Sequence, residues 1–149
     1  MTGFLLNTNV VSELIKPRPA LSVVKWVDST DENLLFLSVL TLGEIRKGIA
    51  GLVKRARRGA LETWLETSLR PRFAGRILPV DEAVADRWGV ITAAAAAAGT
   101  PVPVIDGLLA ATALQHNLTL VTRNAADVAR TGALVLNPFV KDDSRDLTV

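Results

Sequence analysis

Short apolar runs alternate along the chain with longer segments of helical periodicity. The apolar runs are bounded by polar residues and predict strands at residues 4–6, 34–39, 77–80, 118–122 and 134–136. Helical spacing of apolar residues predicts helices at 10–15, 20–27, 41–71, 81–98, 107–116 and 124–129. Strands that alternate with helices are typical of a parallel sheet covered on both faces, so the pattern predicts an α/β fold.

Glycine, proline and capping residues indicate where several helices begin and end. The long helical segment at 41–71 is expected to be interrupted at Gly59 and ended by Pro71, which gives a helical arm of two helices. Asp81 is expected to cap the next helix, which includes an alanine run that strongly favours helix. Residues 1–140 are expected to form one domain, followed by a polar C-terminal tail at 141–149.

The residue inventory excludes several kinds of active site. The chain has 149 residues, no cysteine and one histidine, His116, which excludes thiolate zinc sites, cysteine nucleophiles and histidine clusters. Any bound metal is therefore expected to have oxygen ligands. The chain has neither an apolar run near the ~20 residues of a membrane span nor the features of a signal peptide, so we expect a cytoplasmic protein with no membrane partner.

Basic residues are concentrated in one part of the chain. Residues 45–76 contain nine basic and two acidic residues, although the formal net charge of the whole chain is only +2. A basic face beside an acidic site suits a metal-dependent enzyme that acts on a polyanion. For a charge run alone, a solvated helix face is the ordinary interpretation. The residues expected to contact RNA are Arg46, Lys47, Lys54, Arg55, Arg57 and Arg58.

Five polar residues follow predicted strands or begin predicted helices at one end of the sheet. They are Asn7, Glu44, Asp106, Asn124 and Asp127. Each could simply cap a helix, and Glu44 could complete a capping box with Thr41. Carboxylates that converge at one edge repel one another unless a hard cation neutralises them, and Mg²⁺ and Mn²⁺ prefer oxygen ligands. Their convergence therefore predicts a metal site suited to phosphodiester hydrolysis.

The order of motifs resembles one known family. The stretches LLNTNVVSEL, LSVLTLGEIRKGI, RFAGRILPVDEAVADRWG, IDGLLAATALQHNLTLVTRN and VLNPF are similar to those of PIN-domain ribonuclease toxins of the VapC family, in its FitB-like branch. The resemblance runs from about Phe4 to Phe139. It implies a three-layer α/β/α sandwich and a homodimeric, Mg²⁺-dependent endoribonuclease. It also implies a cognate VapB-type antitoxin, a higher assembly with it, and contact with operator DNA only through that antitoxin.

The resemblance also assigns roles to individual residues. Glu44 and Asp106 correspond to metal-binding acids, and either Asn124 or Asp127 fills the fourth position of the site. Thr8 and Thr122 flank these positions and are expected to orient the ligands.

Asn7 departs from the family pattern, which has a metal-binding aspartate at this position. An amide oxygen can coordinate a cation but brings no negative charge, and its NH₂ group is a donor that a cation repels. We therefore expect weak metal binding and little cleavage by this chain. Two origins stay open, namely a deliberate aspartate-to-asparagine change that tames a toxic nuclease and a naturally inactivated paralogue.

Two other kinds of protein compete with the nuclease hypothesis. One is a catalytically inactive PIN module that binds RNA or an antitoxin, an alternative that Asn7 strengthens. The other is a phospho-acceptor signalling domain, which would have a lysine after a late strand. Here the fourth predicted strand is followed by Arg123 instead, which disfavours that alternative.

Overall fold

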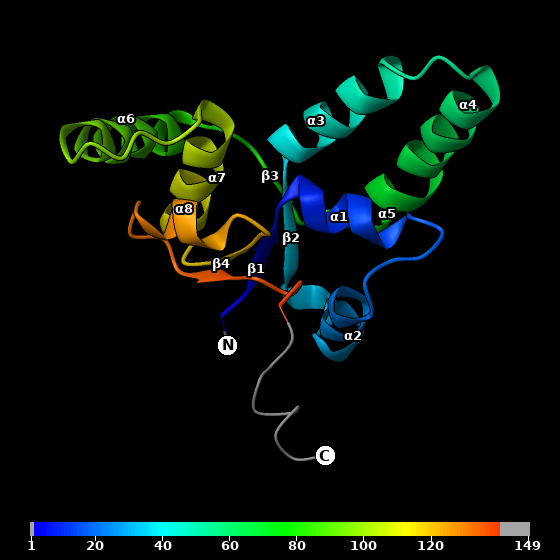
Figure 1. Cartoon of the computed structure of the whole chain (residues 1–149), viewed down its shortest axis with the longest axis horizontal. Coiled ribbons are helices and arrows are strands. Elements are labelled where there is room, and N and C mark those ends of the chain that lie inside the picture. Colours follow the sequence, from blue (N-terminus) through cyan, green and yellow to red (C-terminus); the bar gives the residue numbers. More distant parts are fainter. Residues whose placement is uncertain (1, 141–149) are drawn as a thin grey trace.

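The chain folds around a five-stranded sheet in which all neighbouring strands are parallel (Figure 1). The computed structural model describes residues 2–140, so the predicted tail at 141–149 lies outside the described residues. The strands are β1 (Phe4–Leu6), β2 (Leu35–Ser38), β3 (Ile77–Leu78), β4 (Thr119–Val121) and β5 (Val135–Leu136). They lie in the order β3-β2-β1-β4-β5, which confirms the predicted parallel α/β sheet.

Helices connect each strand to the next. Their bounds are α1 (Thr8–Leu14), α2 (Leu21–Ser29), η1 (Glu32–Leu34), α3 (Val39–Ala50), α4 (Arg55–Trp64), η2 (Leu65–Leu69), α5 (Arg70–Arg72), α6 (Glu82–Ala97), α7 (Val104–Gln115) and α8 (Ala125–Ala129). Here η1 is a 3₁₀-helix and η2 is a π-helix. Asp81 accepts a hydrogen bond from the backbone N–H of Val84 at 3.0 Å, which confirms its predicted capping role.

Alternation along the strands divides the core between the two faces of the sheet. Leu6, Leu35 and Val121 belong to one buried cluster, which includes side chains of α1, α2, α3 and η2. Leu5 and Leu120 belong to another, which includes side chains of α7 and α8. In Figure 1, α6, α7 and α8 accordingly lie on one side of the strands, and α1, α2 and α5 lie on the other. The predicted three-layer α/β/α sandwich is confirmed.

The strand order reverses beside β1. The chain proceeds outward from β1 to β2 and β3, then returns to place β4 on the other side of β1. Where β1 and β4 end, the backbone N–H of Asn7 donates to the carbonyl oxygen of Val121 at 2.9 Å. Open parallel sheets bind ligands at such a reversal, outside the carboxyl ends of the strands. The fold therefore directs attention to the residues that follow β1 and β4.

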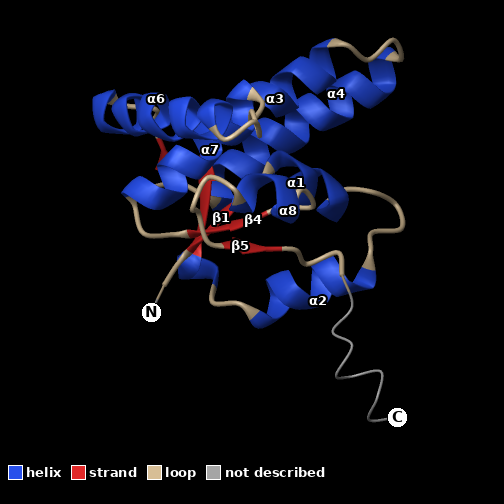
Figure 2. Ribbon diagram, turned by 60° about the vertical axis from the view of Figure 1, so that its left-hand side comes forward, coloured by secondary structure: helices blue, strands red, loops and turns tan. Residues whose placement is uncertain are grey.

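The helical arm is present, but its internal break differs from the prediction. Figure 2 shows α3 and α4 running away from the sheet together. The break falls between Ala50 and Arg55, whereas Gly59 lies inside α4. A single exposed glycine weakens a helix by only about 1 kcal/mol, so it does not have to end one. Pro71 also does not end the arm, because α5 continues to Arg72.

Two helix starts also differ from those predicted, and both bear on capping. Ser38 is the N-cap of α3 and accepts from the N–H of Leu40 at 3.0 Å, so the helix begins before Thr41. A capping box between Thr41 and Glu44 is therefore wrong. Asp106 lies within the first turn of α7 and does not precede it, so the capping interpretation of Asp106 is also wrong.

Within residues 2–140, no helix is both long and apolar enough to cross a membrane.

Replacing Gly3 with alanine should destabilise the fold. A Cβ atom there would lie 2.9 Å from Leu118 Cδ2, 3.0 Å from Phe36 Cε2 and 3.1 Å from the Leu34 carbonyl oxygen. Overpacking of this kind typically costs about 1–3 kcal/mol of the free energy of unfolding, measurable by urea denaturation. Gly89→Ala is the matched control, because a Cβ at that exposed helical position meets no atom within 4 Å. Equal stability of Gly3→Ala and the parent would contradict this packing argument.

Candidate active site

Asn7 lies at the centre of the carboxyl edge of the sheet. Its side chain is buried, with 5% of the residue exposed, and its Nδ2 donates to Thr122 Oγ1 at 2.9 Å. It occupies the N-cap position of α1, yet its side chain makes no capping hydrogen bond. Capping therefore does not explain the side chain. Because Nδ2 is directed at Thr122, Oδ1 is the atom left to face a ligand.

Thr122 connects the turns that follow β1 and β4. Besides Asn7, its Oγ1 accepts from Asn9 Nδ2 at 3.3 Å and from the backbone N–H of Asn124 at 3.2 Å. Asn9 completes the connection, since its Oδ1 accepts from the N–H of Arg123 at 3.3 Å. Thr122 is fully buried, so these bonds have little competition from water. Asn9 is not among the predicted site residues, although its place in the NTN triplet of residues 7–9 was a signal.

Glu44 is held beside the end of β1 by Thr8. Thr8 Oγ1 donates to Glu44 Oε1 at 2.6 Å, the short distance typical of a hydroxyl bound to a carboxylate. Thr8 begins α1 and Glu44 lies one turn and a half into α3, so this bond joins two helices on the same face of the sheet. The contact is of the kind expected for a residue that orients a metal ligand.

Asp106 approaches the same site from the other side of the sheet. It lies in the first turn of α7 and is partly buried. Burial raises the pKa of its carboxyl group, and the nearby carboxylates of Glu44 and Asp127 raise that pKa further. These two contributions to the raised pKa of Asp106 indicate that Glu44 and Asp127 lie in its surroundings. The structure therefore brings Glu44, Asp106 and Asp127 into one electrostatic neighbourhood.

Asn124 and Asp127 occupy the more open edge of this neighbourhood. Both are exposed; Asn124 occupies the N-cap position of α8 but its side chain makes no capping hydrogen bond. Asp127 lies in the first turn of α8, where a carboxylate also interacts favourably with the helix dipole. The effect of Asp127 on the pKa of Asp106 favours Asp127 for the fourth position of the site.

The donor set is made of oxygen atoms, which suits Mg²⁺ or Mn²⁺. Among the described residues, no three histidine, cysteine, aspartate or glutamate side chains are grouped closely enough to enclose a metal ion. Mg²⁺ usually needs only one or two carboxylates, because it retains several waters. Glu44 and Asp106 fit that requirement, with Asn7 Oδ1 as an uncharged third donor.

The basic residues of the arm fall into two groups. Arg46 and Arg70 form ion pairs with Glu66, at 2.6 and 3.2 Å. Arg58 donates from Nε and Nη2 to the Leu52 carbonyl oxygen, at 3.2 and 2.5 Å, and so stabilises the turn between α3 and α4.

The other predicted RNA-contacting residues form no such bond within the part of the chain that the structure describes. They are Lys47, Lys54, Arg55 and Arg57, all of them exposed. The structure thus separates residues that support the arm from those free to meet a polyanion.

Glu13 is a buried acid that is not among the predicted site residues. Only 5% of the residue is exposed, and its carboxylate accepts from Lys16 Nζ at 2.8 Å, the N–H of Ala20 at 2.9 Å and Arg123 Nη2 at 3.4 Å. The hydrogen bond from Lys16 is the main cause of its lowered pKa. Arg123 in turn stacks on the Phe139 ring, 3.9 Å from its centroid. This cluster ties the loop after β4 to α1.

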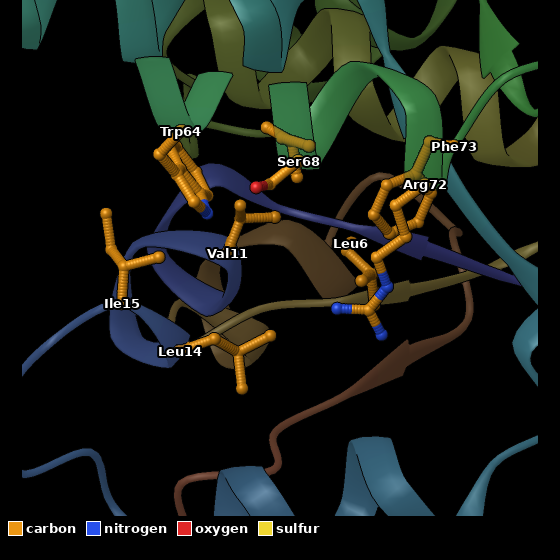
Figure 3. Close-up of a pocket in the computed structure, with 9 residues that line it drawn as sticks. Leu6, Val11, Leu14, Ile15, Trp64, Ser68, Arg72 and Phe73 are labelled. Atoms are coloured by element: carbon orange, nitrogen blue, oxygen red, sulfur yellow. The ribbon is translucent and has the colours of Figure 1, made fainter. Parts of the chain in front are cut away.

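A separate apolar cavity of about 160 Å³ lies between α1 and the arm (Figure 3). Val11 and Leu14 line it from α1, and Trp64 and Phe73 line it from the arm. No carboxylate lines this cavity, so the chemistry of the acids lies elsewhere.

The parallel α/β sheet has Asn7 at its reversal point and acidic residues nearby. Comparison of the chain with known proteins gives its family. The family model described as the PIN domain matches residues 4–134. The chain therefore belongs to the PIN-domain family.

Similar proteins cover nearly the whole chain. Toxin FitB of Neisseria gonorrhoeae is 42% identical over 91% of this chain and 97% of its own length. VapC ribonuclease Y4jK of Sinorhizobium fredii is 34% identical over 91% of this chain and 96% of its own length.

Solved structures agree with this family. The crystal structure of FitAcB from Neisseria gonorrhoeae matches with a TM-score of 0.89 and 40% identity, covering 93% of this chain and 99% of the other. The structure of FitAB bound to the IR36 DNA fragment also has a TM-score of 0.89, with 39% identity and coverage of 93% and 97%.

Asp106→Asn should raise the melting temperature at pH 7 in metal-free buffer. The pKa of Asp106 is raised in the folded chain, so ionisation costs stability as pH rises above about 4, where the unfolded carboxyl group ionises. The difference between variant and parent should therefore shrink as pH falls toward 4, as followed by calorimetry. Asp86→Asn, at an exposed position of α6, serves as the control. If the parent were more stable than Asp106→Asn at pH 7, this result would contradict the raised pKa of Asp106.

Proposed function

We propose that this chain is the toxin of a type II toxin–antitoxin system, built as a metal-dependent endoribonuclease that hydrolyses RNA phosphodiester bonds. The proposal rests on the position of Asn7 at the reversal point of the sheet, on the hydrogen bond that joins Glu44 to the next residue, Thr8, and on the repulsion of Asp106 by Glu44. Two relatives that match most of the chain, one named a toxin and the other a VapC ribonuclease, support the same function.

Each residue of the proposed site has its own role in binding the cation. Glu44 and Asp106 would hold Mg²⁺, or Mn²⁺ in its place, and Asp127 would add negative charge at the open edge. Thr8 fixes the orientation of the Glu44 carboxylate through its hydrogen bond. When bound, the cation activates water and neutralises charge that develops on the phosphate. No cysteine or histidine cluster offers a rival chemistry, since the chain has no cysteine and one histidine.

Asn7 weakens this site without disturbing the fold around it. The amide donates a hydrogen bond to Thr122 and has about the same volume as a carboxylate. What it lacks is negative charge, which supplies most of the attraction for a divalent cation. We therefore assign the chain an impaired activity, through either a deliberate or a natural replacement of aspartate.

Asn7→Asp should bind Mg²⁺ at least about tenfold more tightly than the parent and should cleave RNA. The added carboxylate lies beside Glu44 and Asp106, so a cation relieves a larger repulsion in the variant. Calorimetric titration with Mg²⁺ measures the affinity, and a gel assay on mixed-sequence RNA, with and without EDTA, measures cleavage. Asn7→Asp combined with Asp106→Asn is the matched control, which should restore neither property.

The outcomes of this experiment separate the two candidate functions. RNA or antitoxin binding by both forms, with turnover by neither, would favour the catalytically inactive PIN module that Asn7 suggests. Growth arrest on expression of Asn7→Asp, relieved by co-expression of the neighbouring gene, would support the toxin. Equal cleavage by Asn7→Asp and the parent would overturn the role given to Asn7.

The proposed partner is a VapB-type antitoxin. A basic side chain from such a partner would neutralise the repulsion among Glu44, Asp106 and Asp127 in place of a cation. The relative FitAB has been solved on a DNA fragment, and we propose that operator DNA meets this chain only through its antitoxin. A homodimer is expected from the family, with a higher assembly when the antitoxin binds.

The tip of the arm is proposed to contact the RNA backbone. Lys54, Arg55 and Arg57 are exposed there, and their charges are free for phosphates. Replacing all three with alanine should weaken RNA binding and reduce the slope of log K against log salt by about 2, as expected for three lost contacts to a single strand.

Fluorescence anisotropy at several salt concentrations measures the effect of this replacement. Arg58→Ala is the informative contrast, since Arg58 is bonded to Leu52 and its loss should lower stability. An unchanged salt slope in the triple variant would remove the arm tip from the interface.

A further inference from the structure

The turn after β4 carries a cation that has no role in the site described above. Arg123 lies between Thr122 and Asn124, two residues of that site. Its backbone N–H donates to Asn9 Oδ1 at 3.3 Å, and its carbonyl oxygen accepts from Asn137 Nδ2 at 3.3 Å. The backbone of Arg123 is thus held from two sides, whereas 52% of its side chain is exposed.

An aromatic ring orients the guanidinium group of Arg123. The central carbon of this group lies 3.9 Å from the centroid of the Phe139 ring. Stacking on a ring fixes the plane of an arginine and leaves the N–H groups along its edge available. Within residues 2–140, only Nη2 donates a hydrogen bond, to Glu13, and Nε and Nη1 donate none. A planar fork that is oriented in advance loses little freedom when it binds a phosphate through two N–H groups.

The ion pair with Arg123 is the weakest contact that Glu13 makes. Arg123 Nη2 lies 3.4 Å from Glu13 Oε1, whereas charge-assisted N–H···O bonds are usually about 2.7–2.9 Å long. The same oxygen accepts from Lys16 Nζ at 2.8 Å, and Oε2 accepts from the N–H of Ala20 at 2.9 Å. The hydrogen bond from Lys16 is the largest cause of the lowered pKa of Glu13, and the charge of Arg123 is the smallest. Glu13 therefore keeps two hydrogen bonds when Arg123 leaves it.

The charge and the position of this cluster both suit a phosphate. Two half-exposed cations, Lys16 and Arg123, share the single carboxylate of Glu13, so the cluster keeps a net positive charge. Glu13 lies in the second turn of α1, roughly 7.5 Å along the helix axis from Thr8. The guanidinium group therefore lies beside the acids of the proposed metal site and not among them. This offset suits a phosphate next to the reacting one in an RNA strand.

Comparison with another arginine shows that support of the fold is a poor explanation for Arg123. Arg76 is a supporting arginine, because only 16% of its side chain is exposed. It donates to the carbonyl oxygens of Glu32, Leu35 and Arg72. Arg123 has one long bond from its side chain and is half exposed. The side chain of Arg123 is thus held in orientation but is only weakly bonded.

We propose that Arg123 exchanges Glu13 for the RNA phosphate next to the scissile one when RNA binds. The proposal rests on the ribonuclease function proposed above. The exchange is favourable because a phosphate offers two oxygen atoms to the fork, whereas Glu13 offers one that Lys16 already contacts. Phe139 keeps the plane of the guanidinium group in place during the exchange. Arg123 does not touch the reacting atoms, so it acts in substrate binding.

Arg123→Gln and Glu13→Gln test the exchange, because they should have opposite effects on RNA binding. The probe is a fluorescein-labelled single-stranded RNA of mixed sequence, with binding measured by anisotropy in EDTA at several salt concentrations. Arg123→Gln should bind about fivefold more weakly, with a salt slope lower by about 0.7. Glu13→Gln should bind about twofold more tightly, because its carboxylate no longer competes for Arg123. The melting temperature of Glu13→Gln should nevertheless fall, because the ion pair with Lys16 is lost.

Two further variants separate this exchange from a general effect of charge. In the double variant Arg123→Gln with Glu13→Gln, the tighter binding due to Glu13→Gln should disappear. Arg123→Lys keeps the charge but loses the planar fork, so it should keep the salt slope and lose affinity.

Lys25→Gln is the matched control. Lys25 is exposed on α2, which leads through η1 to the amino end of β2, at the opposite edge of the sheet. Its replacement removes one positive charge, and RNA affinity should equal that of the parent. Weaker binding by both Arg123→Gln and Glu13→Gln would assign the ion pair a supporting role and overturn the proposal. An unchanged salt slope in Arg123→Gln would also overturn it, provided that the parent binds RNA. Failure of the parent to bind RNA, with no cleavage by Asn7→Asp, would overturn the proposed function and this inference together.

Discussion

The meeting of β1 and β4 at their carboxyl ends is the contact on which the rest of the site depends. Two bonds from Asn7 make it, one from the backbone to Val121 and one from the side chain to Thr122. Thr122 then holds the turn after β4 through Asn9 and Asn124. At this junction α1 begins after β1 and α8 begins after β4, and the two helices cover opposite faces of the sheet. Glu44 arrives from one face and Asp106 from the other.

Two acids near this junction, Glu13 and Asp106, have opposite electrostatic surroundings. Glu13 receives three hydrogen bonds, and its pKa is lowered, so its charge is stabilised by the fold. Asp106 faces two other carboxylates, and its pKa is raised, so its charge is destabilised by the fold. Uncompensated charge of this kind marks functional sites, where a ligand supplies the compensation. We propose that Asn7 lowers the repulsion at the junction and, with it, the affinity for a cation.

The basic residues of the arm also divide into those that are bonded within the chain and those that are exposed. Arg58 and Arg46 are used to hold the arm together, the first at the turn after α3 and the second through Glu66. Lys47 and the residues at the tip are exposed and free for a polyanion.

The sequence by itself determined the parallel α/β fold, the exclusion of thiolate ligands and the polar residues near the strand ends, because these follow from periodicity, residue inventory and order along the chain. It also placed Asp81 as a cap, which is a local property. Tertiary structure alone decided that Arg58 supports the arm and that Thr8 holds Glu44. It also decided that Asn9 and Glu13 bind Arg123, in the loop after β4. It also placed the arm break at residues 51–54 and not at Gly59. Each of these depends on which segments, distant in sequence, are brought within a few ångströms, and periodicity carries no information about such distances.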